Sequence, residues 1–254
     1  MIAARNVRID IGGRTLLRDV DAAIDSGAFV GVLGANGVGK TTLLRAIDGR
    51  HPLAAGTLTL DDRAVASFDS TTRARSIALV TSDDSPIDNL SVREVVATGR
   101  YPFHRWWQWS ATPADDAAID AALQAVGMHA FAQRSFATLS SGERQRIWLA
   151  LGLAQEAPLL LLDEPTSHLD VRVAHDILRL LRQQARAGKT VVCAIHDLNE
   201  AAAFADRLML LGDERVIAFD IPERVLTTAN LEIAYGIEME AIRTASGSIR
   251  VFAV

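Results

Sequence analysis

The stretch GANGVGKTTLL occupies residues 34–44 and determines how the rest of the chain is interpreted. Its spacing, Gly34-x-x-x-x-Gly39-Lys40-Thr41, is that of a phosphate-binding loop. Glycines let successive backbone N–H groups converge on one anion, and a helix that begins beside them points the positive end of its dipole at the same anion. The stretch therefore predicts a bound nucleoside triphosphate, a ligand shared by kinases, GTPases, helicases and transporters.

The residues on either side of this loop distinguish a phosphate-binding site from an ordinary glycine-rich turn. Residues 28–33 predict a buried strand and 41–48 the start of a helix, which is the required context. Lys40 supplies a mobile positive charge for the β- and γ-phosphates, and the Thr41 hydroxyl can ligate Mg²⁺. The residues expected to contact the nucleotide here are Gly34, Ala35, Asn36, Gly37, Val38, Gly39, Lys40, Thr41 and Thr42.

The composition limits what else the protein can do. Its 254 residues, 49% of them apolar, are enough for one large α/β domain. The net charge of −5 argues against a nucleic-acid partner, because nucleic-acid binders usually carry a basic face. Cys193, the single cysteine, is expected to be buried in the run TVVCAI. Without a long apolar run or a signal-peptide core, we expect a cytoplasmic protein that reaches the membrane only through a partner.

Short apolar runs alternate with helical patterns along the chain. The expected strands are AFVGVL, SIALV, LLLLD, TVVCAI and RLMLL. Continuous apolar strands separated by helices predict a parallel sheet covered on both faces. The segment 87–155 predicts helices instead: Ser91 opens the first with a capping box, Thr112 and Pro113 open the second, and a third follows Gly142. We therefore expect a helical subdomain inserted into a nucleotide-binding sheet.

Two predicted strands end in residues that can carry chemistry. Asp163 and Glu164 follow one strand, at the carboxyl edge where ligands bind in open α/β sheets. Asp163 suits Mg²⁺, which prefers oxygen ligands, and Glu164 can act as general base toward a water at the γ-phosphate. His196 follows TVVCAI at the same edge, where it could donate to the γ-phosphate or simply cap a helix.

The stretch LSSGERQR at 139–146 predicts a second anion site. Ser140 and Glu143 have the spacing of a capping box, and the helix start offers hydroxyls, Gly142 and free N–H groups. This site lies in the helical segment, away from the first loop. Two chains packed head to tail could bring the two sites together.

The motifs GANGVGKT, LSSGERQR, LLLLDEP and SHLD with His196, in this order and spacing, resemble those of the ATP-binding subunits of ABC transporters over essentially the whole chain. The resemblance implies a P-loop NTPase (RecA-like) α/β fold with a parallel-sheet core and an N-terminal antiparallel β portion. One domain, 1–254, would then comprise a nucleotide-binding core at 1–86 and 156–254 and a helical subdomain at 87–155 that holds the signature.

The same resemblance implies an ATPase that uses ATP and Mg²⁺ and works as a homodimer. Lys40, Glu164 and His196 would be catalytic, with His196 as the switch histidine, and Thr41 and Asp163 would bind the metal. The family signature is usually LSGGQ, so that Ser141 and Glu143 are mild variants. Ser140 and Gly142 would clamp the γ-phosphate of ATP held by the partner subunit, and Asp170 would bridge the subunits. Closing the dimer would drive a membrane permease between two states.

A narrower resemblance concerns the cargo. LSVREVVATGRYPFHRWW and HDLNEAAAFADRLMLL resemble ATPases of importers for iron–siderophore complexes, haem and cobalamin. This implies an importer subunit on the inner face of the cell membrane, first for iron–siderophore complexes and alternatively for haem or cobalamin. Its partners would be a permease and, indirectly, a solute-binding protein. The aromatics of YPFHRWWQW at 101–109 are either a docking surface for the permease or part of the helical core.

Two positions depart from the family pattern. Ile11 stands where an aromatic usually stacks on adenine; it offers apolar contact only, and Arg14 is the candidate to stack instead. Ser82 stands where a glutamine would touch Mg²⁺ and the attacking water, and Asp83 or a bridging water is the alternative there.

Three other classes of ATPase share parts of these motifs. DNA-repair and chromosome-organising ATPases carry long coiled-coil insertions, which this chain lacks. Translation-associated ATPases normally carry two cassettes in one chain, and this chain has one. A nucleotide-binding regulator that no longer hydrolyses ATP stays open because of Ser82, although Lys40, Asp163, Glu164 and His196 are all present.

Overall fold

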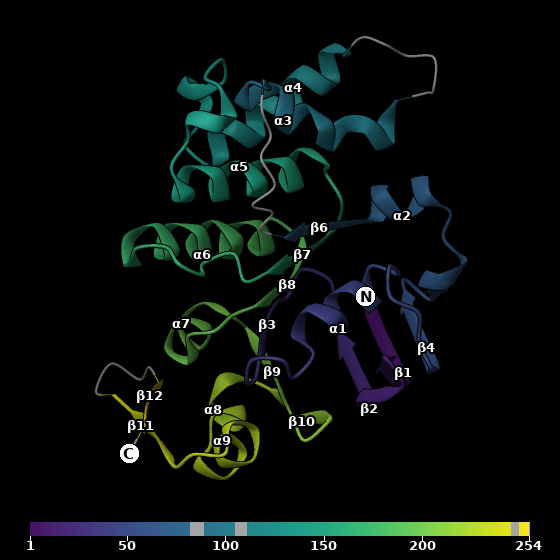
Figure 1. Cartoon of the computed structure of the whole chain (residues 1–254), viewed down its shortest axis with the longest axis vertical. Coiled ribbons are helices and arrows are strands. Elements are labelled where there is room, and N and C mark those ends of the chain that lie inside the picture. The colour runs from purple at the N-terminus through teal and green to yellow at the C-terminus, as the bar shows by residue number, and fades with distance from the viewer. Residues whose placement is uncertain (82–88, 105–110, 245–248, 254) are drawn as a thin grey trace.

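The central sheet has six strands in the part of the chain that this computed structural model describes, which is residues 1–81, 89–104, 111–244 and 249–253. Their order is β10-β9-β3-β8-β7-β6, and all are parallel except β10, which pairs antiparallel with β9 (Figure 1). Their bounds are Phe29–Leu33 for β3, Ile77–Thr81 for β6, Leu159–Asp163 for β7, Thr190–Ala194 for β8, Arg207–Gly212 for β9 and Arg215–Asp220 for β10. The five apolar runs are thus confirmed as parallel strands.

A second, antiparallel sheet covers one face of the central sheet together with helix α1 (Lys40–Ile47). Its strand order is β2-β1-β4-β5, and the strands are β1 (Ile2–Ile11), β2 (Arg14–Ile24), β4 (Ala55–Leu60) and β5 (Arg63–Ala64). Val7 of β1 and Leu44 of α1 share a core with Val32 and Leu161 of the central strands. The expected N-terminal antiparallel portion is therefore present.

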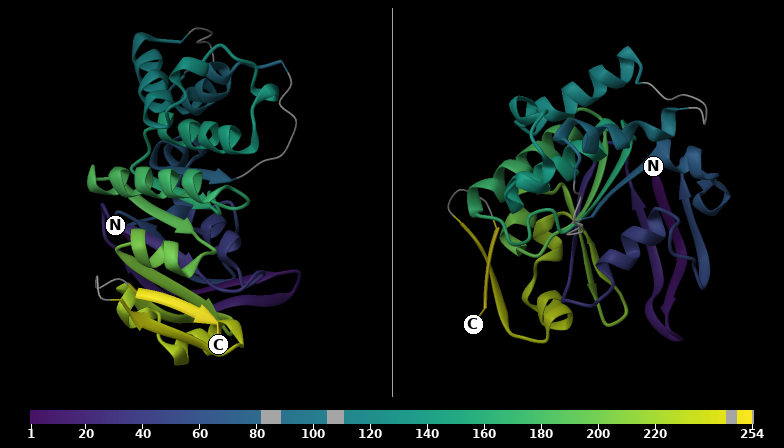
Figure 2. Two further views of the ribbon diagram at one scale, coloured as in Figure 1. Left: turned by 90° about the vertical axis from the view of Figure 1, so that its left-hand side faces the viewer. Right: turned by 45° about the horizontal axis from the view of Figure 1, so that its top comes forward.

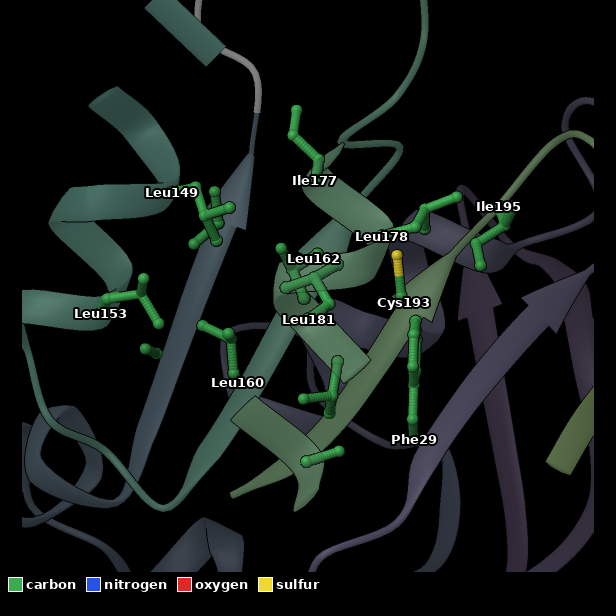
Figure 3. Close-up of a cluster of buried hydrophobic side chains, with 14 of the residues drawn as sticks. Phe29, Leu149, Leu153, Leu160, Leu162, Ile177, Leu178, Leu181, Cys193 and Ile195 are labelled. Atoms are coloured by element: carbon green, nitrogen blue, oxygen red, sulfur yellow. The ribbon is translucent and has the colours of Figure 1, made fainter. Parts of the chain in front are cut away.

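The opposite face is covered by helices α6 (Val171–Arg186) and α7 (Leu198–Phe204). Figure 3 shows side chains of the strands on this face directed toward α6. Phe29, Leu160, Leu162 and Cys193 come from the strands, and Ile177, Leu178 and Leu181 come from α6. Alternate residues along each strand pack into the cores on opposite faces of the sheet. These strands are therefore apolar throughout. Cys193 is buried, as predicted.

Three helices and their connecting turns lie at one end of the molecule (Figures 1 and 2). They are α3 (Val92–Ala97), α4 (Pro113–Ala125) and α5 (Ser141–Ala154), and each begins with a capping box, at Ser91, Thr112 and Ser140 respectively. Their buried side chains are continuous with the core on the α6 face. The helical segment and the sheet therefore share one apolar interior on that side.

The remaining elements are α2 (Ser70–Ser76), α8 (Pro222–Val225), α9 (Thr228–Tyr235) and the hairpin β11 (Met239–Arg243) with β12 (Ile249–Ala253). Short 3₁₀ segments occur at Val65–Ser67, Thr98–Phe103, His129–Phe131 and Phe136–Thr138. The hairpin contacts α7, and α9 contacts β9. Among the described residues, no helix combines the length and apolar character needed to cross a membrane.

Candidate functional site

The glycine-rich loop joins the end of β3 to the start of α1. Gly34, Gly37 and Gly39 have φ values of 143°, 79° and 114°, which residues with a side chain rarely adopt. At Gly34 the fit is also tight, because a Cβ there would lie 2.6 Å from the carbonyl oxygen of Leu211 on β9. The loop can therefore keep this shape only with glycine at its first position.

Lys40 folds back over the loop. Its side chain is only 4% exposed, and Nζ donates to the carbonyl oxygens of Gly34 at 2.9 Å and Ala35 at 3.3 Å. Burial lowers the pKa of Lys40, and the charges of Glu164 and Asp163 oppose that change. The ammonium group is thus partly desolvated beside the loop, where a phosphate anion would interact with it strongly.

Thr41 and Asp163 meet at the carboxyl edge of the sheet. The Thr41 hydroxyl at the start of α1 donates to Asp163 Oδ1 at the end of β7, over 3.0 Å. Burial raises the pKa of Asp163, while the bond from Thr41 opposes the rise. These two oxygens are a donor set that fits Mg²⁺, which binds proteins through one or two side chains and completes its shell with phosphate oxygens and water. The described residues contain no larger His, Cys, Asp or Glu cluster suited to a metal.

Glu164 lies between groups from three elements. His196, just after β8, places Nε2 2.6 Å from Glu164 Oε2, Ser167 donates to the same oxygen at 3.3 Å, and Lys40 Nζ is 4.0 Å from Oε1. The backbone of Glu164 is itself left-handed, with φ of 53°, which costs about 1 kcal/mol for a residue with a side chain. The carboxylate is therefore held in a defined place at the loop, half-buried and able to accept a proton.

The signature residues lie apart from this cluster. Ser140 is the N-cap of α5, and Glu143 Oε2 accepts from the backbone N–H and the hydroxyl of Ser140 at 2.8 and 2.9 Å. These bonds lower the pKa of Glu143. Ser141 starts the helix, and Gly142 lies near Leu169 and Val173.

Asp170 likewise forms its hydrogen bond within its own helix. It caps α6, accepting from the Val173 N–H at 3.0 Å. Within the described ranges, no hydrogen bond or ion pair joins Asp170 or residues 140–143 to residues 34–42. Figures 1 and 2 show α5 and α1 on opposite sides of α6 and the sheet. One chain alone therefore does not bring its signature to its own phosphate loop.

Of the two positions that depart from the family pattern, the structure describes Ile11 but not Ser82. Ile11 and Arg14 pair across the β1–β2 turn, both are exposed, and Ile11 is 48% accessible. They are free to contact a ligand but present no aromatic face. Ser82 and Asp83 lie outside the described residues.

The structure describes Tyr101 and Phe103 of the aromatic segment and leaves both interpretations as predictions. Phe103 is half-buried, and the guanidinium groups of Arg100 and Arg75 lie 4.0 Å and 5.2 Å from its ring centre. Tyr101 is 68% exposed. The tryptophans at 106, 107 and 109 lie outside the described residues.

Sequence reasoning missed two groups near the site. Ser167, which bonds Glu164, lies within the motif SHLD but had no expected role. Tyr235 lies near the backbone of Gly34 although it comes from the far end of the chain, and no motif marks it. The only available signal was an aromatic residue directly before Gly236, which ends α9 in a left-handed conformation.

Comparison with known proteins places these features in context. A family model described as ABC transporter matches residues 17–167. The hemin import ATP-binding protein HmuV of Pseudomonas fluorescens is 39% identical over 244 residues, covering 94% of each chain. The ferric enterobactin transport ATP-binding protein FepC of Escherichia coli is 35% identical over 241 residues, covering 93% of this chain and 87% of that one.

Solved structures of ABC transporters are also similar to this chain. A metal-chelate type ABC transporter in an inward-facing conformation matches with a TM-score of 0.87 at 26% identity, covering 100% of this chain and 97% of the other. The bacterial ABC transporter cassette MJ0796, solved as a dimer, matches with a TM-score of 0.76 at 27% identity, covering 87% of this chain and 99% of that one.

Proposed function

Because this chain belongs to the ABC transporter family, we propose that it is the ATP-hydrolysing subunit of an importer, with its nucleotide on residues 34–42. One observation carries the assignment of the site: Lys40, Glu164 and His196 come from three separate elements and converge beside the phosphate loop. Residues 1–86 and 156–254 form the nucleotide-binding core in this proposal, and residues 87–155 the helical subdomain.

Some residues around the loop bind the phosphates, and others activate the attacking water. Backbone N–H groups of the loop and the ammonium of Lys40 hold the phosphates and offset the charge that develops during transfer. Glu164 orients the attacking water and takes its proton, while His196 and Ser167 keep the carboxylate in place. Mg²⁺, when bound, would be held by Thr41 and Asp163 and would neutralise charge on the phosphate oxygens.

A homodimer completes the site in this proposal. Ser140, Gly142 and the start of α5 would face ATP held by the partner, with Asp170 beside the shared site. The separation of the signature from the loop within one chain supports this arrangement, as does the dimeric form of the related cassette. Ile11 and Arg14 would contact the adenine without aromatic stacking. The dimer would act on an integral-membrane permease at the inner face of the cell membrane.

We propose iron–siderophore complexes as the cargo class. The ferric enterobactin transport relative and a siderophore transport relative from Bacillus subtilis support this choice. The hemin relatives support haem as the alternative, and a cobalamin relative from Halobacterium salinarum, 41% identical over 89% of this chain, keeps cobalamin open. Cargo is selected by other subunits, so uptake has to be measured in an assembled complex supplied with each cargo in turn.

The metal assignment is tested by Asp163→Asn. Asparagine keeps the shape and can still accept from Thr41, but it gives up the charge that binds Mg²⁺, so ATP hydrolysis should fall about 100-fold or more. The ligand-free variant should nevertheless melt higher at neutral pH, by about 2 °C. The pKa of Asp163 is raised in the folded chain, so the folded state binds this proton more tightly than the unfolded state. In the parental chain, the free energy of unfolding therefore falls as pH rises from the ordinary aspartate pKa through the raised pKa of Asp163. Asparagine carries no charge, so the variant avoids this loss.

The readouts are phosphate release with and without a Mg²⁺ chelator, and melting temperature as a function of pH. The gain in melting temperature should disappear at pH values below the ordinary aspartate pKa. Asp213→Asn, at an exposed carboxylate beyond β9, is the matched control. Parental Mg²⁺-dependent hydrolysis in Asp163→Asn would contradict the metal assignment.

A further inference from the structure

The segment that carries His196 continues directly into helix α7. Asp197 is the N-cap of this helix, and its carboxylate accepts from the N–H groups of Asn199 at 2.7 Å and Glu200 at 3.0 Å. Asn199 therefore lies in the first turn of α7, three residues after His196. Because the cap bonds join these residues into one turn, a shift of that turn would carry His196 with it.

The side chain of Asn199 bonds both backbone groups of Val251 on β12. Its Oδ1 accepts from the Val251 N–H at 2.9 Å, and its Nδ2 donates to the Val251 carbonyl oxygen at 3.3 Å. A neighbouring strand would make the same pair of bonds with one residue of β12. The amide thus joins the start of α7 to the C-terminal hairpin at a fixed position.

The hairpin end of this connection is itself well anchored. Val251 is 6% exposed and belongs to the core on the α6 face of the sheet. It pairs with Ala241 of β11, and β11 in turn contacts α9. The backbone of Val251 is therefore a fixed point, to which the Asn199 amide can hold a helix.

The other end of α7 is held separately, by α6. Arg182 of α6 donates to the carbonyl oxygen of Ala203 at 2.8 Å, and the rings of His175 and Phe204 meet edge to face, with their centres 5.1 Å apart. Helix α7 is thus fixed to α6 near its C-terminal end and to the hairpin near its N-terminal end. Only the N-terminal attachment lies next to His196.

We propose that Asn199 is a positioning residue for ATP hydrolysis, which holds the start of α7 so that His196 stays against Glu164. The inference rests on the proposed hydrolytic site, and Asn199 acts through His196 and not on the nucleotide. His196 Nε2 lies 2.6 Å from Glu164 Oε2. A displacement of about 1 Å would take these atoms out of hydrogen-bond range and would leave the carboxylate poorly oriented toward the water.

The first test is Asn199→Ala, which removes both bonds to Val251. The net value of one hydrogen bond corresponds to about three- to tenfold in a rate, and we expect kcat for ATP hydrolysis to fall by about this factor. The Kd for ATP should stay close to the parental value, because Lys40 and the loop N–H groups are unchanged. Phosphate release under saturating ATP and titration with a fluorescent ATP analogue measure the two quantities.

Asn199→Asp is a second variant, and it keeps the shape of the side chain. It can still accept from the Val251 N–H, but it has no donor for the Val251 carbonyl and sets a carboxylate oxygen against that carbonyl. We therefore expect kcat to fall here as well. This variant decides the question even if Asn199→Ala does not fold.

The chain supplies a matched control in Asn230→Ala. The Asn230 amide donates to the carbonyl oxygens of Val225 at 3.0 Å and Arg224 at 3.4 Å, and it thereby joins α9 to α8. Asn230 and Asn199 are both half-buried, so the two alanine variants make the same chemical change with a comparable loss of melting temperature. Asn230→Ala should nevertheless keep the parental kcat, because no bond of Asn230 leads to His196.

A double variant shows whether Asn199 acts through the histidine. In a His196→Ala chain there is no imidazole left to position. Adding Asn199→Ala should therefore lower the residual kcat no further, whereas two independent effects would multiply.

Parental kcat in the folded Asn199 variants would overturn the proposal. The same fold loss from Asn199→Ala with and without His196 would overturn it as well, and so would an equal loss of kcat in Asn230→Ala. Parental hydrolysis by His196→Ala would show that the proposed role of His196 is wrong, and that of Asn199 with it. A strong effect of His196→Ala beside parental Asn199 variants would overturn only the role of Asn199.

Discussion

Glu164→Gln is expected to lower kcat for ATP hydrolysis about 100-fold or more and to leave the Kd for ATP close to the parental value. The amide keeps the shape of the carboxylate and can still contact Ser167 and His196, but it cannot take a proton from water. Nucleotide affinity depends mainly on the loop N–H groups and Lys40, which are unchanged. Phosphate release under saturating ATP and titration with a fluorescent ATP analogue measure the two quantities.

A matched control is Glu240→Gln, which alters an exposed carboxylate on β11. It should hydrolyse ATP at the parental rate. If Glu164→Gln did the same, Glu164 would not be the general base, and the bond network around it would have only a structural role.

Mixing two inactive variants is expected to restore ATP hydrolysis. Lys40→Ala removes the charge at the phosphate loop, and Ser140→Arg places a bulky cation at the start of α5, so each homodimer carries a lesion in both of its sites. In a mixed dimer with shared sites, one site carries both lesions and the other carries none. Hydrolysis by the mixture should therefore exceed that of either variant alone by roughly tenfold or more, because one intact site regains its oriented groups.

The control is a mixture of Lys40→Ala with the double variant Lys40→Ala/Ser140→Arg. No intact site can form in that mixture, so it should stay inactive. Differently tagged chains show whether mixed dimers form. Mixed dimers without recovered hydrolysis would contradict the sharing of sites between subunits.

Local features of this fold could be predicted from the sequence. The strands were recognisable because a sheet covered on both faces needs apolar side chains at every position. The phosphate loop was recognisable because its glycines are required by its own backbone, and the capping boxes because Ser91 and Ser140 bond residues only three positions away.

Features that depend on distant residues could not be predicted in the same way. The contact between His196 and Glu164 requires β8 to lie beside β7, which is a pairing between separate parts of the chain. The proximity of Tyr235 to Gly34 joins residues 201 positions apart and depends on how α9 packs on β9. Packing of this kind leaves no periodic or spacing signal, so only the structure reveals it.

The most direct test of the importer assignment is cargo uptake by the assembled complex. The chain is co-purified with its permease in liposomes that contain ATP, and uptake of a radiolabelled ferric siderophore from its binding protein is followed over time. We predict accumulation that requires ATP inside the vesicle and is abolished by Glu164→Gln, with less or no uptake of haem and cobalamin. Uptake of haem or cobalamin in place of the siderophore would contradict the cargo. A complex that hydrolyses ATP but accumulates none of the three would contradict the importer assignment itself.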